Sequence, residues 1–261
     1  MQVASSARAV VNFVEGTKEP VFSNWDPARV RMDIVPVEAG IENIRELPVA
    51  PTLDNEGFAL VRHPVAGDWK DQFWIDSVYV PSCIELVCNL TGARDATQIF
   101  FPLTRSSEPV GEGVAYAGSF LHLDIPREEY FGFARIEADK AGFDLQPGKA
   151  AVFNVWKAIT PPPQQMPLAI CNRHDLTEPD YVVGLNDEDE YPSHFVAVRT
   201  PDRRLRLSYV PDIAIDESLV FIAADFDPAH TLGCAHQAIE PAGAGALNPR
   251  TSIEVRILAL F

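Results

Sequence analysis

The chain has 261 residues, 47 % of them hydrophobic, so it can bury a substantial core and is too apolar to be disordered. A formal net charge of −16 gives the average surface a field that repels nucleic acid and anionic membranes, so neither is an expected partner. Four cysteines without a close pair predict free thiols. With no signal-like leader and no bilayer-length apolar run, the pattern predicts a soluble, cytoplasmic protein.

Short β-rich runs, separated by Pro, Gly, Asp and Asn, recur along most of the chain. In chain order they are ARAVVNFV, VRMDIVPV, GFALVRHP, QIFFPL, SFLHLDI, AAVFNVWKAI, FVAVR, RLRLSYV, SLVFIAADF and SIEVRILALF. Many short strands at this spacing are typical of an all-β sandwich or barrel.

Helical spacing is confined mainly to two stretches. Residues 67–93 place aromatic and aliphatic residues at loosely helical intervals, and Pro81 is expected to divide this stretch into two helices. Residues 127–143 follow Pro126, are rich in Glu and predict another short helix.

The chain shows no internal repeat and no linker, so we expect one domain spanning residues 1–261. About residues 1–110 would form a mixed N-terminal buttress, and about residues 111–261 a jelly-roll core. The predicted fold class is therefore mainly β, a double-stranded β-helix of the jelly-roll or cupin-like kind with a few flanking helices.

A histidine and an aspartate lie two positions apart in the apolar run GSFLHLDIP. Because side chains alternate along a strand, His122 and Asp124 point to one face and their leucine neighbours to the other. With a third histidine from a distant strand they would form a 2-His-1-carboxylate triad, which leaves adjacent positions of Fe(II) open. Taken alone, the motif also fits a half-exposed strand with two polar residues facing solvent.

The segment FDPAHTLGCAHQAIEP offers His230 and His236 as the third ligand. Near the end of the chain, Arg250-Thr251-Ser252 has the Arg-x-Ser form that pairs with the far carboxylate of 2-oxoglutarate in iron oxygenases using that cosubstrate. Arg256 competes for this role, because it has the same strand parity as Arg250.

These motifs resemble a known family of microbial secondary metabolism, the hydroxylase/desaturase group. The group includes gibberellin-desaturase-like proteins, the cephamycin 7-hydroxylase component and relatives that form aziridines or endoperoxides. The likeness is carried by LDNEGFALVRHP, CNLTGA, FNVWKAI…MPLAICN, LSYVPDIAIDESLVFIAADFD and NPRTSIEVRILALF.

The resemblance implies a non-heme Fe(II)- and 2-oxoglutarate-dependent dioxygenase, an oxidoreductase that uses O2. It implies a small-molecule substrate and an outcome of hydroxylation, desaturation or ring formation. Its iron ligands would be His122, Asp124 and His236, with His230 left over. Its 2-oxoglutarate anchor would be Arg250 with Ser252, with Arg256 as the competitor and Lys157 as a further group for a carboxylate.

Several questions stay open in the sequence. A cupin-like metal-binding protein without 2-oxoglutarate turnover is the alternative function. The substrate could be an amino acid, a peptide or a polycyclic metabolite. The apolar ending ILALF fits either burial within the fold or an interface in a homodimer. Arginines at 199, 203, 204 and 206 would attract an anionic substrate, bind a partner or form salt bridges with the acidic residues that are in excess.

Overall fold

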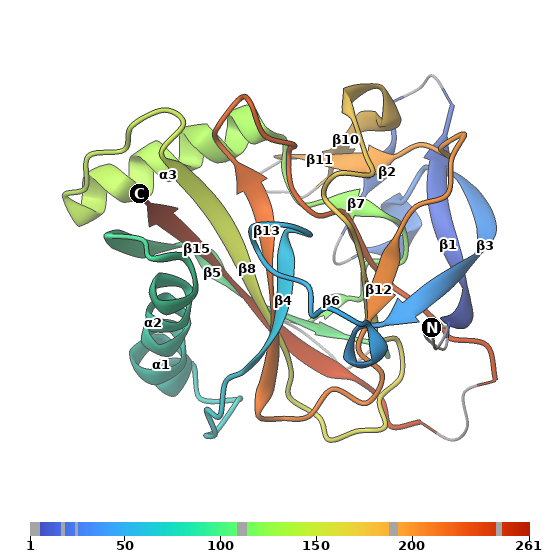
Figure 1. Ribbon diagram of the computed structural model, residues 1–261, viewed down its shortest axis with the longest axis horizontal. Coiled ribbons are helices and arrows are strands. Elements are labelled where there is room, and N and C mark those ends of the chain that lie inside the picture. Colours follow the sequence, from blue (N-terminus) through green and yellow to red (C-terminus); the bar gives the residue numbers. More distant parts are fainter. Residues whose placement is uncertain (1–5, 17–18, 24–25, 109–113, 188–192, 244–246) are drawn as a thin grey trace.

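The computed structural model describes residues 6–16, 19–23, 26–108, 114–187, 193–243 and 247–261. Two sheets, with helices on the flank, make up the molecule (Figure 1). The nine-stranded sheet has the order β1-β3-β12-β9-β14-β7-β11-β10-β2. Its strands are β1 (Ser6–Glu15), β2 (Val21–Phe22), β3 (Asp33–Asn43), β7 (His122–Leu123), β9 (Leu168–Cys171), β10 (Tyr181–Asn186), β11 (Ser193–Val198), β12 (Leu207–Tyr209) and β14 (His236–Ala238).

The six-stranded sheet has the order β4-β13-β8-β15-β5-β6. Its strands are β4 (Phe58–Arg62), β5 (Asp95–Ser106), β6 (Ala115–Tyr116), β8 (Ala150–Ala158), β13 (Glu217–Asp225) and β15 (Thr251–Leu260). Leu168 and Ile170 of the nine-stranded sheet pack with Trp156 and Phe221 of the six-stranded one. The two sheets therefore enclose a common interior, as a jelly roll does.

Strands from the first 110 residues belong to both sheets. β1 and β3 extend the nine-stranded sheet, whereas β4 and β5 are members of the six-stranded one. The first four residues of the ending ILALF, 257–260, lie in β15, which pairs with β8 on one side and β5 on the other. They are buried within the fold, whereas the last residue, Phe261, follows the strand and is 44 % exposed.

Three helical elements follow one another directly: α1 (Gln72–Trp74), the π turn η3 (Ile75–Tyr79) and α2 (Val80–Thr91). A separate helix, α3, spans Arg127–Ala141. Short 3-10 turns are η1 (Pro27–Arg29), η2 (Ile44–Glu46) and η4 (Glu178–Asp180). The expectation of two helices divided at Pro81 is wrong, because helical backbone runs without a break from α1 through α2. Pro81 lies in the first turn of α2, directly after the π turn η3. A proline is tolerated there because the wider turn changes the hydrogen-bonding pattern just before it.

Both long helices pack on the six-stranded sheet. Cys83 and Val87 of α2 join a cluster with Val155 and Ile257, on the outer face of that sheet. Ala134 and Ala138 of α3 join a different cluster, which includes Val152 and Leu258. These two strand residues have the opposite parity to Val155 and Ile257, so they point to the other face of the sheet. Helix α3 therefore covers one end of the interior and borders the site described below.

Strand β5 is distorted where it passes this interior. Glu254 of β15 pairs with Leu103 and Arg256 pairs with Ile99, so residues 100–102 of β5 face a single residue of β15. Phe100 has a φ of 65°, in the left-handed region. The extra residues form a bulge, a feature that re-aims side chains next to functional sites.

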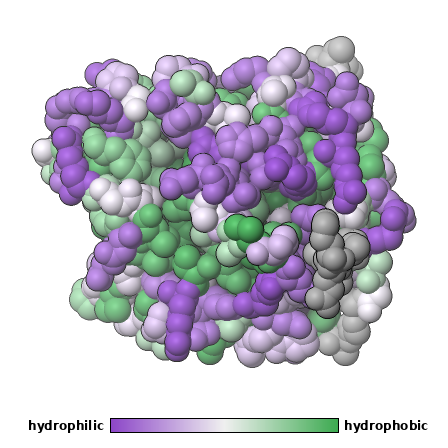
Figure 2. Space-filling model, in the orientation of Figure 1, coloured by the Kyte–Doolittle hydropathy of each residue, from purple (hydrophilic) through white to green (hydrophobic). Residues whose placement is uncertain are grey.

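Figure 2 shows hydrophilic side chains over most of the viewed face, with a smaller hydrophobic area beside α2 and β4. All four cysteines are free. Within the described part of the chain, none of the helices combines the length and apolar character needed to cross a membrane.

Candidate metal centre

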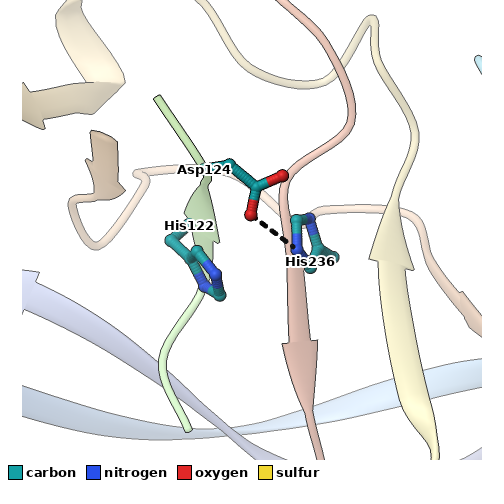
Figure 3. A group of neighbouring side chains, drawn as sticks. All are labelled: His122, Asp124 and His236. Carbon is teal, nitrogen blue, oxygen red and sulfur yellow. Dashed lines mark ion pairs between the residues drawn. The ribbon is translucent and has the colours of Figure 1, made fainter. Parts of the chain in front are cut away.

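The two strands β7 and β14 lie side by side in the nine-stranded sheet. His122 of β7 is directly opposite His236 of β14 in the antiparallel register. Asp124 follows β7 by one residue, and its carboxylate turns back toward the two imidazoles, as Figure 3 shows. Leu121 and Leu123 point to the other face and enter the core there, as the predicted alternation requires.

These three side chains form a compact set of ligand atoms. Each offers one atom, and the three atoms all lie within 4.8 Å of one another. His236 Nε2 is 3.7 Å from Asp124 Oδ1, and the two imidazole ring centres are 4.6 Å apart. His122 and His236 are 8 % and 5 % exposed, so the donors meet in a nearly dry interior.

Backbone carbonyls fix which nitrogen each imidazole presents. His122 Nδ1 lies 2.8 Å from the carbonyl oxygen of Phe120, and His236 Nδ1 lies 3.2 Å from that of Cys234. A carbonyl only accepts, so each Nδ1 carries the proton and donates it. The Nε2 lone pair of each ring is therefore directed toward the centre, in the tautomer that a metal-binding histidine needs.

The pKa values of the histidines agree with this arrangement. Burial, with the neighbouring His236, lowers the pKa of His122 to about 4. Burial also lowers the pKa of His236, against the attraction of Asp124. Both rings are therefore neutral at physiological pH and keep their lone pairs.

Asp124 is held ionised by its neighbours. Burial alone would raise the pKa of this carboxyl, but the charge of Arg256 holds it below its ordinary value, and the two histidines add to this effect once acid protonates them. Its Oδ2 accepts from Asn154 Nδ2 at 2.8 Å, from Arg256 Nε at 3.3 Å and from the Tyr130 hydroxyl at 3.4 Å. Oδ1 lies 3.3 Å from Arg256 Nη2 and 3.7 Å from His236 Nε2, so it is the oxygen that faces the histidines and the natural ligand atom.

Two hollows meet at the triad. A cavity of about 880 Å³ is lined by His122, Asp124 and Arg256 at its inner end. A narrow recess of about 10 Å³ lies on the other side, lined by both histidines, Trp156 and Arg250. His122 and Arg105 border both hollows. The large cavity therefore reaches His122 and Asp124, and the recess reaches both histidines, with Arg105, Arg250 and Glu254 as its charged residues.

The two candidate anchor arginines have different environments. Arg256 forms ion pairs with Asp124, at 3.3 Å, and with Glu254. Arg250 is 2 % exposed, donates to the Ser252 hydroxyl and stacks over Trp156, with its Cζ 5.3 Å from the ring centre. Its Nε is buried without a hydrogen-bond partner, and no carboxylate in the described ranges forms an ion pair with it. Burial, with Arg105, lowers the pKa of Arg250 to about 10.

Lys157 does not belong to this group, which corrects the expectation that it assists with a carboxylate. On β8 its side chain has the opposite parity to Asn154 and Trp156, so it points to the outer face of the sheet. There its Nζ donates to the carbonyls of His63, at 2.9 Å, and Glu217, at 3.1 Å.

Residues outside the predicted site also shape it. Asn154, Tyr130 and Glu254 surround Asp124 and Arg256 without being singled out by the sequence motifs. Strand parity gave one signal for Glu254. It has the same parity as Ser252 and Arg256 of β15, and as Arg250 just before the strand, so these side chains share a face. Gly118 had no such signal, yet a Cβ at this position would lie 2.7 Å from Cε1 of His122.

Other polar groups singled out in the sequence lie elsewhere. His230 follows a turn, 57 % of its side chain is exposed, and its Nδ1 lies 3.0 Å from Asp225 rather than near the triad. Arg203 forms an ion pair with Asp180, and Arg206 forms one with Asp175, so these two arginines pair with acidic residues of the chain itself.

Comparison with protein families and curated proteins places the chain among oxidoreductases. Residues 11–260 match the family model described as "Oxidoreductase/YMDC permease-like domain". The chain is 28 % identical over 257 residues to oxidoreductase clz16 of Cochliobolus lunatus, an alignment covering 87 % of this chain and 86 % of that protein. It is 27 % identical over 289 residues to oxidoreductase R2 of Phoma sp., covering 98 % and 97 % of the two chains.

Solved structures show the same fold. A variant of the iron and alpha-ketoglutarate-dependent endoperoxidase NvfI, in which one tryptophan is replaced by phenylalanine, superposes with a TM-score of 0.84 at 20 % identity, covering 100 % of this chain and 99 % of that one. The unsubstituted endoperoxidase gives 0.80 at 18 % identity, with 98 % of each chain covered. These likenesses confirm the predicted mainly β fold with a jelly-roll core and flanking helices.

Proposed function

The chain belongs to the Oxidoreductase/YMDC permease-like domain family, and on that premise we propose that it is an Fe(II)- and 2-oxoglutarate-dependent oxygenase acting on a small molecule of secondary metabolism. His122, Asp124 and His236 would hold the iron. The observation that carries the proposal is this donor set, two neutral imidazoles and one ionised carboxylate, set between a large cavity and a recess that contains Arg250.

The donors fit Fe(II). Two histidines and one carboxylate on one side of the metal leave adjacent positions open, which is the pattern of non-heme iron oxygenases. The same donor types can hold a catalytic zinc ion, whereas a magnesium or calcium site would be built mainly from oxygen ligands. Bound Fe(II), 2-oxoglutarate and O2 together supply the oxidant that removes hydrogen from a substrate C–H bond.

Arg250 is the proposed anchor for the far carboxylate of 2-oxoglutarate. Its buried Nε lacks a partner, whereas Arg256 is already paired with Asp124 and Glu254. Ser252, which accepts from Arg250, is positioned to donate its own hydroxyl proton to the same carboxylate. Because the recess has room for about one water molecule, the Arg250 and Trp156 side chains must shift to admit the dicarboxylate.

The role left to Arg256 is to position Asp124. By holding Oδ2 together with Asn154, it keeps the carboxylate ionised and its Oδ1 directed at the metal position. The competing assignment of Arg256 as the cosubstrate anchor would require it to leave two carboxylates inside a buried site, which is costly.

The relatives support an oxidoreductase and do not select its reaction. The curated relatives are named only as oxidoreductases, and the solved neighbours are described as an endoperoxidase. Hydroxylation, desaturation and ring formation therefore all belong to the proposal, because each begins with abstraction of hydrogen from a positioned C–H bond.

The test is an anaerobic titration of the purified apoprotein with Fe(II) and then with 2-oxoglutarate. We expect the weak visible charge-transfer band of chelated Fe(II)-2-oxoglutarate, and its loss in Asp124→Ala. In Arg250→Leu, 2-oxoglutarate should bind roughly 100-fold more weakly while Fe(II) binding is retained, because a buried ion pair loses one partner.

The outcomes separate the alternatives. Iron binding without the band would indicate the cupin-like metal-binding protein that does not turn over 2-oxoglutarate. A weakening of 2-oxoglutarate binding in Arg256→Leu but not in Arg250→Leu would move the anchor to Arg256. Failure of the wild type to bind Fe(II) would reject the proposal as a whole.

We further propose that the chain acts as a single domain in the cytoplasm. Residues of its first 110 positions and of its remainder share both sheets, which supports one folding unit. Analytical ultracentrifugation would decide between a monomer and the homodimer allowed by the sequence.

A further inference from the structure

The volume and lining of the larger cavity indicate which class of molecule it can bind. Its volume of about 880 Å³ is near the upper end of the range for small-molecule sites, so it exceeds what a free amino acid would fill. It reaches the triad at His122 and Asp124 and opens between strand β5 and helix α3. A molecule bound there would have one carbon beside the metal position.

Most of the lining is apolar. Phenylalanines and aliphatic residues from β2, β5, β11, α3 and the segments on either side of β7 form the wall: Phe22, Ile99, Phe100, Phe101, Leu103, Phe120, Ile125, Phe133, Ile136 and Phe195. Phe22, Phe120 and Phe195 contact one another edge to face, with ring centres 5.3 to 6.2 Å apart. Such a wall gains most from ligand surface that is itself apolar.

Several polar residues of the lining already have partners within the chain, either backbone carbonyls or another side chain. Gln98 donates to the carbonyl of Phe100 at 2.7 Å, and Lys140 pairs with Glu137 at 2.7 Å. Arg105 donates to the carbonyl of Tyr116 at 2.8 Å. A zwitterionic amino acid or a peptide needs charged or hydrogen-bonding partners in its binding site. In this cavity it would lose its hydrogen bonds to water without gaining equivalent ones from the protein.

The mouth of the cavity leaves apolar side chains in solvent. Phe101, at the β5 bulge, is 90 % exposed, and Ile136 and Phe133 of α3 are 52 % and 36 % exposed. All three also line the cavity, so they form a continuous apolar path from the surface inward. Exposed apolar area that continues into a pocket is the usual mark of a binding site.

We infer that the substrate presents a bulky, largely hydrocarbon skeleton, fused-ring or branched, to the metal centre, and that Phe101 and Ile136 at the mouth contribute to its binding. This inference rests on the proposed function for the reaction itself. Among the classes that the sequence leaves open, it selects polycyclic metabolites over amino acids and peptides.

The test measures the cavity directly, with 1-aminoanthracene as a neutral three-ring fluorescent probe. The protein loaded with Fe(II) and 2-oxoglutarate is titrated without O2, and the metal-free protein is titrated in parallel. Progesterone serves as the fused-ring competitor, dodecanoic acid as a linear amphiphilic one, and L-asparagine and triglycine as polar ones. Because the probe site needs no iron, failure of the metal centre and failure of the apolar cavity are read separately.

Two pairs of variants locate the binding. Phe101→Asp and Ile136→Asp place a charge at the mouth, whereas Phe73→Asp and Ile215→Asp place it at apolar residues that are 78 % and 54 % exposed and lie outside the cavity lining. We expect the first pair to weaken probe binding about tenfold or more and the second pair to leave it within about twofold.

The expected result is displacement of the probe by progesterone, weaker displacement by the linear dodecanoic acid and none by the polar compounds, and stronger displacement by dodecanoic acid than by progesterone would overturn the bulky skeleton. Equal weakening in both pairs of variants would place the probe elsewhere and overturn the inference. Displacement by L-asparagine or triglycine alone, or no binding of any apolar compound, would overturn it as well.

Discussion

Asp124 shows how much one carboxylate depends on the groups behind it. Its Oδ2 collects three donors from β8, β15 and α3, while its Oδ1 faces His236. These donors are unequal, because the Asn154 contact is 2.8 Å and the Tyr130 contact is 3.4 Å. The shorter bond should contribute more to fixing the ligand.

Removal of the Asn154 amide is therefore expected to weaken metal binding. Asn154→Ala should lower Fe(II) affinity about 10-fold to 100-fold, the usual cost of losing a group that orients a ligand. Tyr130→Phe is the matched control and should change the affinity much less. Anaerobic Fe(II) titration measures both, and equal effects in the two variants would contradict the ranking of the donors.

Gly118 affects the same site in a different way, because its lack of a side chain leaves space for the His122 ring. A Cβ at this position would lie 2.7 Å from the His122 ring, closer than such atoms approach, so the imidazole must move. Gly118→Ala should thus reduce metal affinity at least about tenfold while far-ultraviolet circular dichroism stays unchanged. Gly132→Ala, where nothing lies within 4 Å, is the control. An unaltered affinity in Gly118→Ala would mean that the ring adapts freely.

At the scale of elements, helix α3 and its C-terminal cap contain two glycines in opposite situations. Gly132 lies in the exposed helix interior, whereas Gly142 caps the helix C-terminus with a φ of 74°. A Cβ added at either position would meet no atom within 4 Å, so backbone preference alone decides the outcome. Glycine is unfavourable in a helix and favoured at a left-handed cap.

The two substitutions should consequently act with opposite sign. Gly132→Ala is expected to raise the free energy of unfolding by about 0.5 to 1 kcal/mol, and Gly142→Ala to lower it by about 1 kcal/mol. Urea denaturation of the metal-free protein provides the comparison. A shift of the same sign in both variants would show that something other than backbone conformation governs these positions.

Elements were predictable where local patterning decides them. The long strands β8, β13 and β15 and helix α3 follow their sequence runs closely. The helical stretch around Pro81 was not, because a π turn absorbs the proline and no residue pattern announces such a turn. The bulge in β5 was equally hidden, since it depends on pairing with β15.

At the scale of the whole molecule, the site was predictable only in part. Strand parity predicted that His122 and Asp124 share a face. The family resemblance suggested His236 as the third ligand and Arg250 as the 2-oxoglutarate anchor. The proposed choice of Arg250 over Arg256 rests on tertiary structure, because both residues have the same strand parity and only their partners differ. Lys157 was misjudged for the same reason, since strand parity fixes a face without telling which face encloses the site.

Global stability should respond to pH through His63, which lies outside the metal centre. Burial, with the charge of Lys157, lowers the pKa of His63 from 6.5 to about 4, and its ring bonds Ser218 at 3.0 Å and Ser82 at 3.1 Å. Because the unfolded chain takes up the proton first, stability is fully present above about pH 6.5 and is lost as pH falls toward about 4.

The expected loss is on the order of 2 kcal/mol between pH 7 and pH 4.5 for this group. Chemical denaturation of the metal-free protein at several pH values measures it, and His63→Gln should flatten that part of the profile while lowering stability at pH 7. An unchanged pH profile in His63→Gln would assign the acid sensitivity to other groups.

The direct pairing of His122 with His236 has a consequence for folding as well as for chemistry. A metal ion held by both acts as a reversible cross-link between chain positions 114 residues apart (236 − 122). Because the unfolded chain offers no such preformed pair, mass action makes the native state more favourable as free metal rises. The supply of iron would thereby set how long the protein persists, in addition to how fast it works.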